Sequence, residues 1–231
     1  MFHDPHLDRT TDGRGRIQTQ PYHGALDQLR TTQAPHQKIP TLTETLSLLA
    51  KPENSHVILN VDVKVDNDPS RVFALVRRTL EGVSDSWRSS LAPRIILGLW
   101  HPKYIAPAKR FLPECRLAHI GMSPALAREY FWQDCHAFSM NFASLVGADG
   151  QAFRDECAAS GKDLYVWTVN KRTEMIEATK WGAKAILTDR TAEFLALRDE
   201  MQHDFNAVGK ETSWLFPWSS VWYSQLVNVR C

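Results

Sequence analysis

Residues 164–169 read Leu-Tyr-Val-Trp-Thr-Val, an apolar stretch with the length and the β-branched and aromatic content of a buried strand. A helix-forming stretch follows at 173–180, and a second short apolar stretch lies at 185–187, after Gly182. Glycine often follows the last turn of a helix because it adopts the left-handed conformation without strain. This order of strand, helix and strand predicts parallel strands joined by crossover helices, the unit of an α/β fold.

The same alternation extends toward the N-terminus as far as residue 57, which indicates a parallel sheet covered by helices. The strands are predicted at 57–63, 94–100, 117–120, 137–142, 164–169 and 185–187. The helices are predicted at 69–80, 105–111, 124–132, 151–160, 173–180 and 192–201. A closed (β/α)8 barrel needs eight strands, so six leave either an incomplete barrel or an open doubly wound sheet. No glycine-rich phosphate loop follows any of the strands, which weakens the Rossmann-type alternative.

The bulk properties narrow the class of protein. The chain has 231 residues, 43% of them hydrophobic, and a formal net charge of +1. It is large enough for one full core, and its basic residues form no stripe, so we expect no nucleic-acid partner. The four cysteines have no Cys-x-x-Cys spacing, which predicts reduced, mostly buried thiols in a cytoplasmic protein. We find no signal-like opening segment and no apolar stretch that could span a membrane.

Two regions differ from the regular middle of the chain. Residues 10–21 are rich in Thr, Gly, Arg and Gln and are expected to form a loop, whereas 41–50 reads as a short amphipathic helix. We place the main domain at 1–201 and treat 202–231 as a separate aromatic tail. Three of the eight tryptophans lie in 214–229. Such a tail either contacts a membrane surface peripherally, packs back on the domain or stays without fixed structure.

Three clusters of polar or aromatic residues lie where strands are expected to meet their C-terminal loops. His3 stands next to Asp4 at the start of a polar loop, and imidazole titrates near neutral pH. Asp62 and Lys64 alternate on one side of a strand end, where they could hold a cation and a phosphate oxygen. Trp167 closes the strand quoted above and could form a pocket wall. The structural alternatives are a surface histidine, a plain Asp–Lys ion pair and a core tryptophan.

Several ordered segments together resemble the glycerophosphodiester phosphodiesterase family over about residues 1–200. The opening FHDPHLDRTTDGRGRI resembles the family's segment after its second strand, and IPTLTETL resembles a helix start. VDVK at 61–64 has the place of an acidic-x-Lys strand end. LYVWTVN and WGAKAILTDR resemble the closing signature. The aspartate at position 62 and the Gly-Leu-Trp strand further resemble the fungal phosphatidylglycerol phospholipase C branch.

The resemblance implies a TIM (β/α)8-type barrel that hydrolyses glycerophosphodiesters or glycerophospholipids with a divalent metal, Ca²⁺ or Mg²⁺. It assigns His3 as the general acid, Asp62 as a metal ligand, Lys64 as a phosphate contact and Trp167 as a wall near the glycerol moiety. The metal would act as a Lewis acid toward the phosphoryl oxygens.

The chain also departs from the family pattern, which begins with a His-Arg pair on the first strand and Glu-x-Asp on the second. Neither motif is present. We therefore expect a barrel that lacks the first strand and helix and most of the second strand, with an incomplete metal site. The alternative to an enzyme is an inactive remnant that binds a glycerophosphate or lipid ligand, or a partner protein. An unrelated α/β hydrolase is disfavoured because no Gly-x-Ser-x-Gly motif is present.

Overall fold

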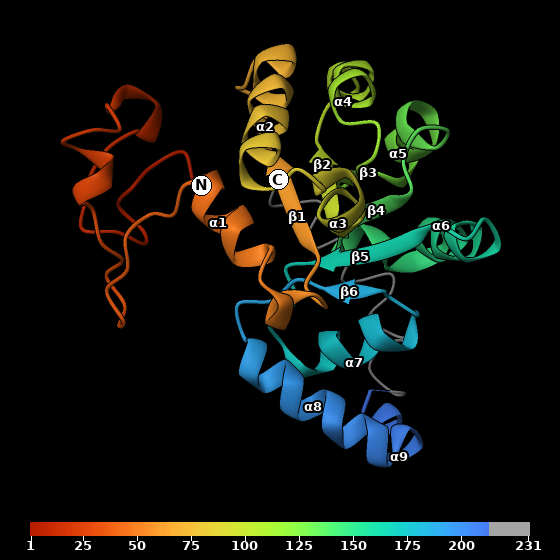
Figure 1. Cartoon of the computed structure of the whole chain (residues 1–231). Coiled ribbons are helices and arrows are strands. Elements are labelled where there is room, and N and C mark those ends of the chain that lie inside the picture. The colour runs from red at the N-terminus through yellow and green to blue at the C-terminus, as the bar shows by residue number, and fades with distance from the viewer. Residues whose placement is uncertain (213–231) are drawn as a thin grey trace.

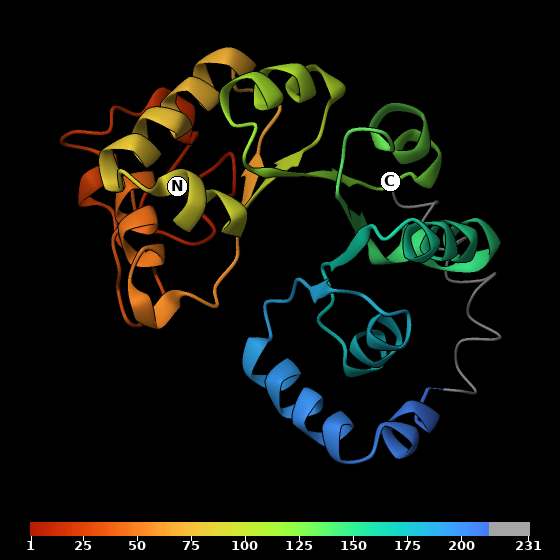
Figure 2. The same ribbon diagram turned by 45° about the vertical axis from the view of Figure 1, so that its right-hand side comes forward.

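The computed structural model describes residues 1–212, and its central feature is one curled sheet of six parallel strands in chain order. The strands are β1 (Leu59–Val63), β2 (Ile95–Leu99), β3 (Arg116–Gly121), β4 (Ala137–Asn141), β5 (Asp163–Trp167) and β6 (Ala185–Ile186). Helices follow the outer side of the curve, as Figures 1 and 2 show. The expected parallel α/β fold is confirmed, and the sheet forms a half-barrel of the TIM type. Within the described residues the sheet stays open between β1 and β6.

The helices alternate with the strands as the sequence predicts. Their bounds are α1 (Leu42–Leu49), α2 (Pro69–Val83), α3 (Trp87–Ser90), α4 (Ile105–Phe111), α5 (Pro124–Phe131), α6 (Gly147–Ala159), α7 (Arg172–Lys180), α8 (Thr191–His203) and α9 (Phe205–Lys210). The Asp68 carboxylate caps α2 by accepting a hydrogen bond from the Arg71 amide at 2.7 Å. Gly161 and Gly182 follow α6 and α7 with φ of 63° and 73°, so the predicted glycine ends are confirmed.

The two faces of the sheet bury different residues. On β2, Ile95, Leu97 and Leu99 belong to the main core between sheet and helices, whereas Ile96 belongs to a smaller cluster on the concave face. This alternation follows from the two-residue period of a strand. The concave cluster also contains Ala118, Ala137 and Tyr165. The apolar cluster on the concave face is therefore small. The polar groups of the site lie at the carboxyl end of the same face.

The N-terminal lobe, which we define as residues 1–40, is built differently. It has no α-helix or named strand, and three isolated antiparallel bridges and two short 3-10 helices give it its shape. Leu7, Leu26 and Ile39 form its own small hydrophobic cluster, separate from both clusters of the sheet. In Figure 1 the lobe lies beyond α1 as the red and orange loops. The lobe therefore contributes to the molecule as a second, much smaller packing unit.

The structure shifts two of the expected boundaries. The first strand begins at Leu59 rather than Val57, because pairing with β2 starts at Leu59 and Ile95; Val57 and Ile58 remain exposed. The expected domain boundary at residue 201 falls inside α8, and Val208 of α9 belongs to the main core. The proposed aromatic membrane contact at 214–229 lies outside the described residues.

The cysteines that the structure describes are buried and free. They are Cys115, Cys135 and Cys157, and burial raises the pKa of each thiol to about 12. For these three the prediction of reduced, buried thiols is confirmed. No helix within residues 1–212 has the length and apolar character needed to cross a membrane.

Candidate active site

The site begins at the carboxyl end of β1, where Asp62 and Lys64 project together. The Lys64 ammonium donates to Asp62 Oδ2 at 2.6 Å, so the ion pair expected as a structural alternative is present. The Trp100 indole N–H donates to Asp62 Oδ1 at 2.8 Å. The Lys64 ammonium also lies over the Trp100 ring, 5.4 Å from its centroid. Both oxygens of Asp62 are therefore engaged, and the carboxylate is held in one orientation.

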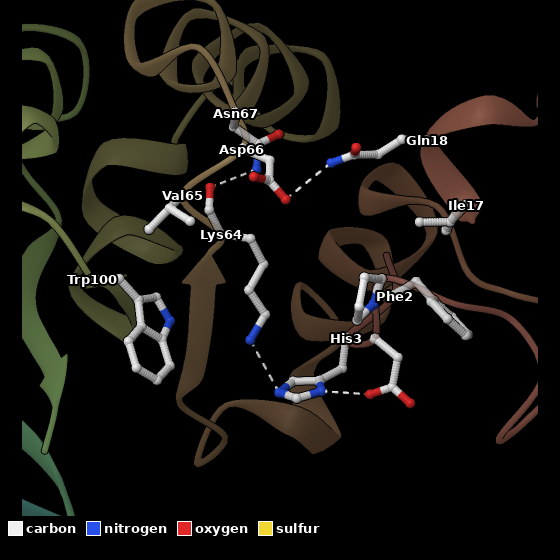
Figure 3. Close-up of a pocket in the computed structure, with 11 residues that line it drawn as sticks. Phe2, His3, Ile17, Gln18, Lys64, Val65, Asp66, Asn67 and Trp100 are labelled. Carbon is white, nitrogen blue, oxygen red and sulfur yellow. Dashed lines mark hydrogen bonds and ion pairs between the residues drawn. The ribbon is translucent and has the colours of Figure 1, made fainter. Parts of the chain in front are cut away.

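The lobe brings His3 to the same place, 61 residues away from Lys64 in the sequence. The Lys64 ammonium donates to His3 Nε2 at 3.1 Å, and Nε2 lies 3.7 Å from Asp62 Oδ2. Figure 3 shows the Lys64 side chain extended from the end of β1 toward the imidazole. Three residues that the sequence singled out thus meet in one cluster. The His3 side chain stays 70% exposed, so it is open to a ligand from solvent.

Asp4 and Arg9 fix the imidazole from behind. The His3 Nδ1–H donates to Asp4 Oδ1 at 2.8 Å, and the Arg9 guanidinium binds both oxygens of Asp4, with 2.9 Å from Nη2 to Oδ1. Hydrogen bonds from Arg9 and then from His3 hold the pKa of the Asp4 carboxyl well below its usual range. The ionised Asp4 accepts at Nδ1 and leaves Nε2 directed toward Lys64. The sequence places Asp4 beside His3 but contains no signal for its pairing with Arg9, five residues on.

A pocket of about 480 Å³ opens beside this cluster, between the lobe and the end of β1. Its walls are mostly apolar. The lining residues are Phe2, His3, Asp4, Pro5, Ile17, Gln18, Lys64, Val65, Asp66, Asn67 and Trp100. The volume is that of a small-molecule site. Of these residues, Gln18, Asp66 and Trp100 were not among the site residues that we predicted.

Trp167, the predicted pocket wall, lies one layer further in. Its ring contacts the edge of Trp100 with centroids 5.8 Å apart, and its indole N–H donates to the Ser139 carbonyl at 2.9 Å. Trp100 lines the pocket and Trp167 does not. The two indoles come from β5 and from the residue after β2, so they meet across the concave face at the carboxyl end of the sheet.

The two halves of the closing signature also meet. The Asn170 amide donates to Asp189 Oδ2 at 2.9 Å, and its carbonyl oxygen accepts from the Thr188 hydroxyl and the Asp189 amide. These bonds join the loop after β5 to the loop after β6. The two segments that resemble the family signature therefore fix two neighbouring loops at the mouth of the half-barrel.

The described side chains do not by themselves fit a divalent cation. Ca²⁺ takes six to eight oxygen ligands and Mg²⁺ about six. No group of three His, Cys, Asp or Glu side chains that could hold a metal is found within residues 1–212. Both Asp62 oxygens are already engaged by Lys64 and Trp100. What the cluster offers instead is the Lys64 ammonium and the His3 imidazole, which suit an anion.

The fold and the position of this site define the class of protein. A parallel half-barrel of the TIM type, with polar side chains gathered at the carboxyl ends of its strands, has the arrangement of barrel enzymes. The model of the glycerophosphoryl diester phosphodiesterase family matches residues 1–193. The chain therefore belongs to this family of phosphodiesterases, whose members generally use divalent metal ions.

Solved structures agree on the fold. A phosphodiesterase from Oleispira antarctica, determined in complex with the product sn-glycerol-3-phosphate, is 19% identical, with a TM-score of 0.63 over 86% of this chain and 78% of that one. A glycerophosphodiester phosphodiesterase from Parabacteroides distasonis is 21% identical, with a TM-score of 0.64 over 87% and 78%. One from Agrobacterium tumefaciens is 19% identical, with a TM-score of 0.60 over 86% and 79%. No curated protein matches the chain.

Proposed function

We propose that this chain hydrolyses glycerophosphodiesters or glycerophospholipids and releases glycerol phosphate or a phosphorylated head group. The observation that carries the proposal is the convergence of His3 and Lys64 beside a pocket of about 480 Å³. The sn-glycerol-3-phosphate in the Oleispira antarctica phosphodiesterase supports a glycerol phosphate as one product. Activity on phosphatidylglycerol, the substrate of the branch that the sequence resembles, is the lipid version of the same proposal.

Lys64 is proposed to bind a non-bridging oxygen of the phosphodiester. In the free protein its ammonium is shared between Asp62 and His3 Nε2. A phosphodiester is an anion that accepts charge-assisted hydrogen bonds, so its arrival gives Lys64 a stronger partner than a neutral imidazole. Nε2 then loses its donor and can carry a proton of its own. Ligand binding would thus prepare the imidazole for proton donation.

His3 is proposed to protonate the leaving alcohol. Hydrolysis breaks one phosphorus–oxygen bond, and water forms the new one and releases one proton to the solvent. The departing alkoxide takes up a proton from His3, which the solvent then replaces. The Asp4 carboxylate accepts from Nδ1 and so holds the ring with Nε2 directed toward the ligand site. Trp167 is proposed to form the wall near the glycerol moiety through its contact with Trp100. Asp62 is proposed to hold the Lys64 ammonium through their ion pair, and it would become a metal ligand only by releasing Lys64 or Trp100.

A second function has its own support. Since the described residues offer no set of three metal ligands, the chain could bind a glycerophosphate or a phospholipid head group without hydrolysing it. The ammonium of Lys64 and the imidazole of His3 are sufficient to hold a phosphate group. Turnover of the substrate, and not affinity for it, distinguishes an enzyme from a binding protein at this site.

The test is hydrolysis of glycerophosphocholine and of phosphatidylglycerol vesicles by the purified chain, with Ca²⁺ or Mg²⁺ and again with EDTA. The proposal predicts release of the phosphorylated product and its loss in His3→Ala. His6→Ala removes an exposed histidine of the same lobe that does not line the pocket, and it should match the wild type. Turnover retained in His3→Ala would contradict the assignment. Binding of glycerol 3-phosphate without turnover under any condition would favour the binding protein.

A further inference from the structure

The pocket beside His3 has two chemically different ends. Lys64 and His3 present cationic or donor groups at one end, where Arg9 neutralises the Asp4 carboxylate, and Asp66 presents a carboxylate at the other, as Figure 3 shows. Phe2, Ile17 and other apolar side chains lie between these polar groups. A ligand that fills such a pocket would carry a negative and a positive group separated by a short apolar linker.

Asp66 carries a charge that no described lysine or arginine neutralises, and it lies in the wall of the pocket. Within the described residues, the side chain has one hydrogen-bond partner, the Gln18 amide at 3.2 Å, and forms no ion pair with a lysine or arginine. The Lys103 ammonium binds the neighbouring Val65 carbonyl at 3.0 Å. Asp68, two residues on, is committed to capping α2. Asp66 is therefore the carboxylate at this end that remains available to a ligand cation.

We infer that the pocket selects glycerophosphodiesters with a cationic head group, choline above all, and that Asp66 is the residue that determines this preference. This inference rests on the proposed function. With the phosphate on Lys64, the head-group alcohol extends into the apolar part of the pocket. A quaternary ammonium loses little hydration there, packs against aromatic and aliphatic surfaces, and meets the Asp66 charge. A glycerol or inositol head group is neutral, so it can donate hydroxyl hydrogen bonds to Asp66 but gains no charge–charge attraction.

The expected size of the preference for a cationic head group follows from the solvent exposure of Asp66. Asp66 is exposed, and an exposed ion pair changes an equilibrium by about fivefold at most. We therefore expect the wild type to favour glycerophosphocholine over glycerophosphoglycerol by about fivefold in kcat/KM. Primary ammonium is more strongly hydrated than trimethylammonium, so glycerophosphoethanolamine should fall between the two.

The experiment compares kcat/KM for glycerophosphocholine and glycerophosphoglycerol in the wild type, Asp66→Asn, Asp66→Lys and the control Asp85→Asn. Asp85 is an exposed aspartate that does not line the pocket, so its variant removes the same charge elsewhere. The choline-to-glycerol ratio should fall to about one in Asp66→Asn, drop further in Asp66→Lys and stay at its wild-type value in Asp85→Asn. A ratio near one in the wild type, or one that Asp66→Lys leaves unchanged, would overturn the inference.

Two further arms separate this inference from the proposed function. If the wild type hydrolyses neither compound, the same ratio is measured in binding by calorimetry; selective, Asp66-dependent binding then supports the head-group site although the hydrolase proposal fails. Hydrolysis without selectivity supports the hydrolase proposal and overturns the head-group site. Absence of both binding and hydrolysis overturns the two proposals together. Vesicles of phosphatidylcholine and of phosphatidylglycerol, compared with the soluble diesters, show whether the cationic head group is read from a lipid or from a free diester.

Discussion

The N-terminal lobe and the half-barrel are stabilised in different ways, and the site depends on both. The half-barrel has a main core that runs between the sheet and its helices, with Phe73, Phe138 and Phe153 fully buried. The lobe has three buried hydrophobic residues, and polar contacts such as His3 to Lys64 and Gln18 to Asp66 join it to the end of β1. Because His3 belongs to the lobe, the proposed acid lies in the unit with the smaller hydrophobic cluster of these two. Substitutions in the lobe should therefore disrupt the site at a smaller loss of stability than is needed to unfold the half-barrel.

The largest expected effect separates the two units directly. Phe138→Ala should reduce the free energy of unfolding of the half-barrel by about 3–5 kcal/mol, because it leaves a cavity in the main core. Leu7→Ala removes one of the three members of the lobe cluster and should unfold the lobe locally. Denaturation followed by tryptophan fluorescence reports mainly on the half-barrel, since residues 1–40 contain no tryptophan.

For Leu7→Ala we expect an almost unchanged fluorescence transition, faster hydrogen exchange confined to 1–40, and loss of turnover. Phe138→Ala should shift the fluorescence transition itself. Equal shifts in the two variants would show that lobe and half-barrel unfold as one unit and would contradict their separate stabilisation.

A buried histidine makes the half-barrel sensitive to acid. His119 on β3 stacks on Phe131 with ring centroids 3.8 Å apart, and burial lowers its pKa to about 4 from an ordinary value near 6.5. Between these values the unfolded chain binds a proton that the folded chain does not, so stability is complete above about pH 6.5 and falls as the pH drops toward 4. The loss from this one group is on the order of 2–3 kcal/mol.

His119→Asn keeps an N–H donor for the Leu99 carbonyl but does not titrate. The variant is expected to be less stable at pH 7 because the ring is lost, yet its unfolding free energy should change less between pH 6.5 and 4 than that of the wild type. Chemical denaturation at several pH values checks this. Parallel pH profiles for the two proteins would contradict the assignment.

On the lobe side, the Asp4–Arg9 pair should matter for turnover and hardly for stability. Asp4→Asn removes the carboxylate that accepts from His3 Nδ1 and binds Arg9, so we expect kcat/KM to fall about tenfold. The midpoint of the fluorescence transition should stay in place. Asp85→Asn serves as the matched control for a lost surface charge. A loss of stability equal to the loss of activity would show that the pair supports the fold instead of orienting the imidazole.

The smallest effect is expected at the junction of the two units. Trp100→Phe keeps an aromatic face beneath Lys64 but removes the N–H that binds Asp62 Oδ1, and kcat/KM should fall about fivefold. Trp181→Phe is the control, because the Trp181 ring stacks on Phe142 and does not line the pocket. Unchanged turnover in Trp100→Phe would mean that Lys64 alone orients Asp62.

The sequence predicted the regular part of the chain because its signals are local. The alternation at 57–201 and the glycines after α6 and α7 depend on periodicity and caps, and each of the six predicted strands and their helices is present. His3, Asp62 and Lys64 were also predicted as candidates, and the structure brings the three together. Asp4 with Arg9, and Gln18 with Asp66, escaped prediction because loop contacts within the lobe and across to β1 have no period to reveal them.

The most direct test of the account is a double-mutant cycle on kcat/KM for glycerophosphocholine with His3→Ala, Lys64→Met and the double variant. His3 Nε2 and the Lys64 ammonium are 3.1 Å apart although one belongs to the lobe and the other to the end of β1. If they act in one site, the double variant should lose far less activity than the product of the two single losses. Losses that simply multiply would contradict a shared site at the junction of lobe and half-barrel.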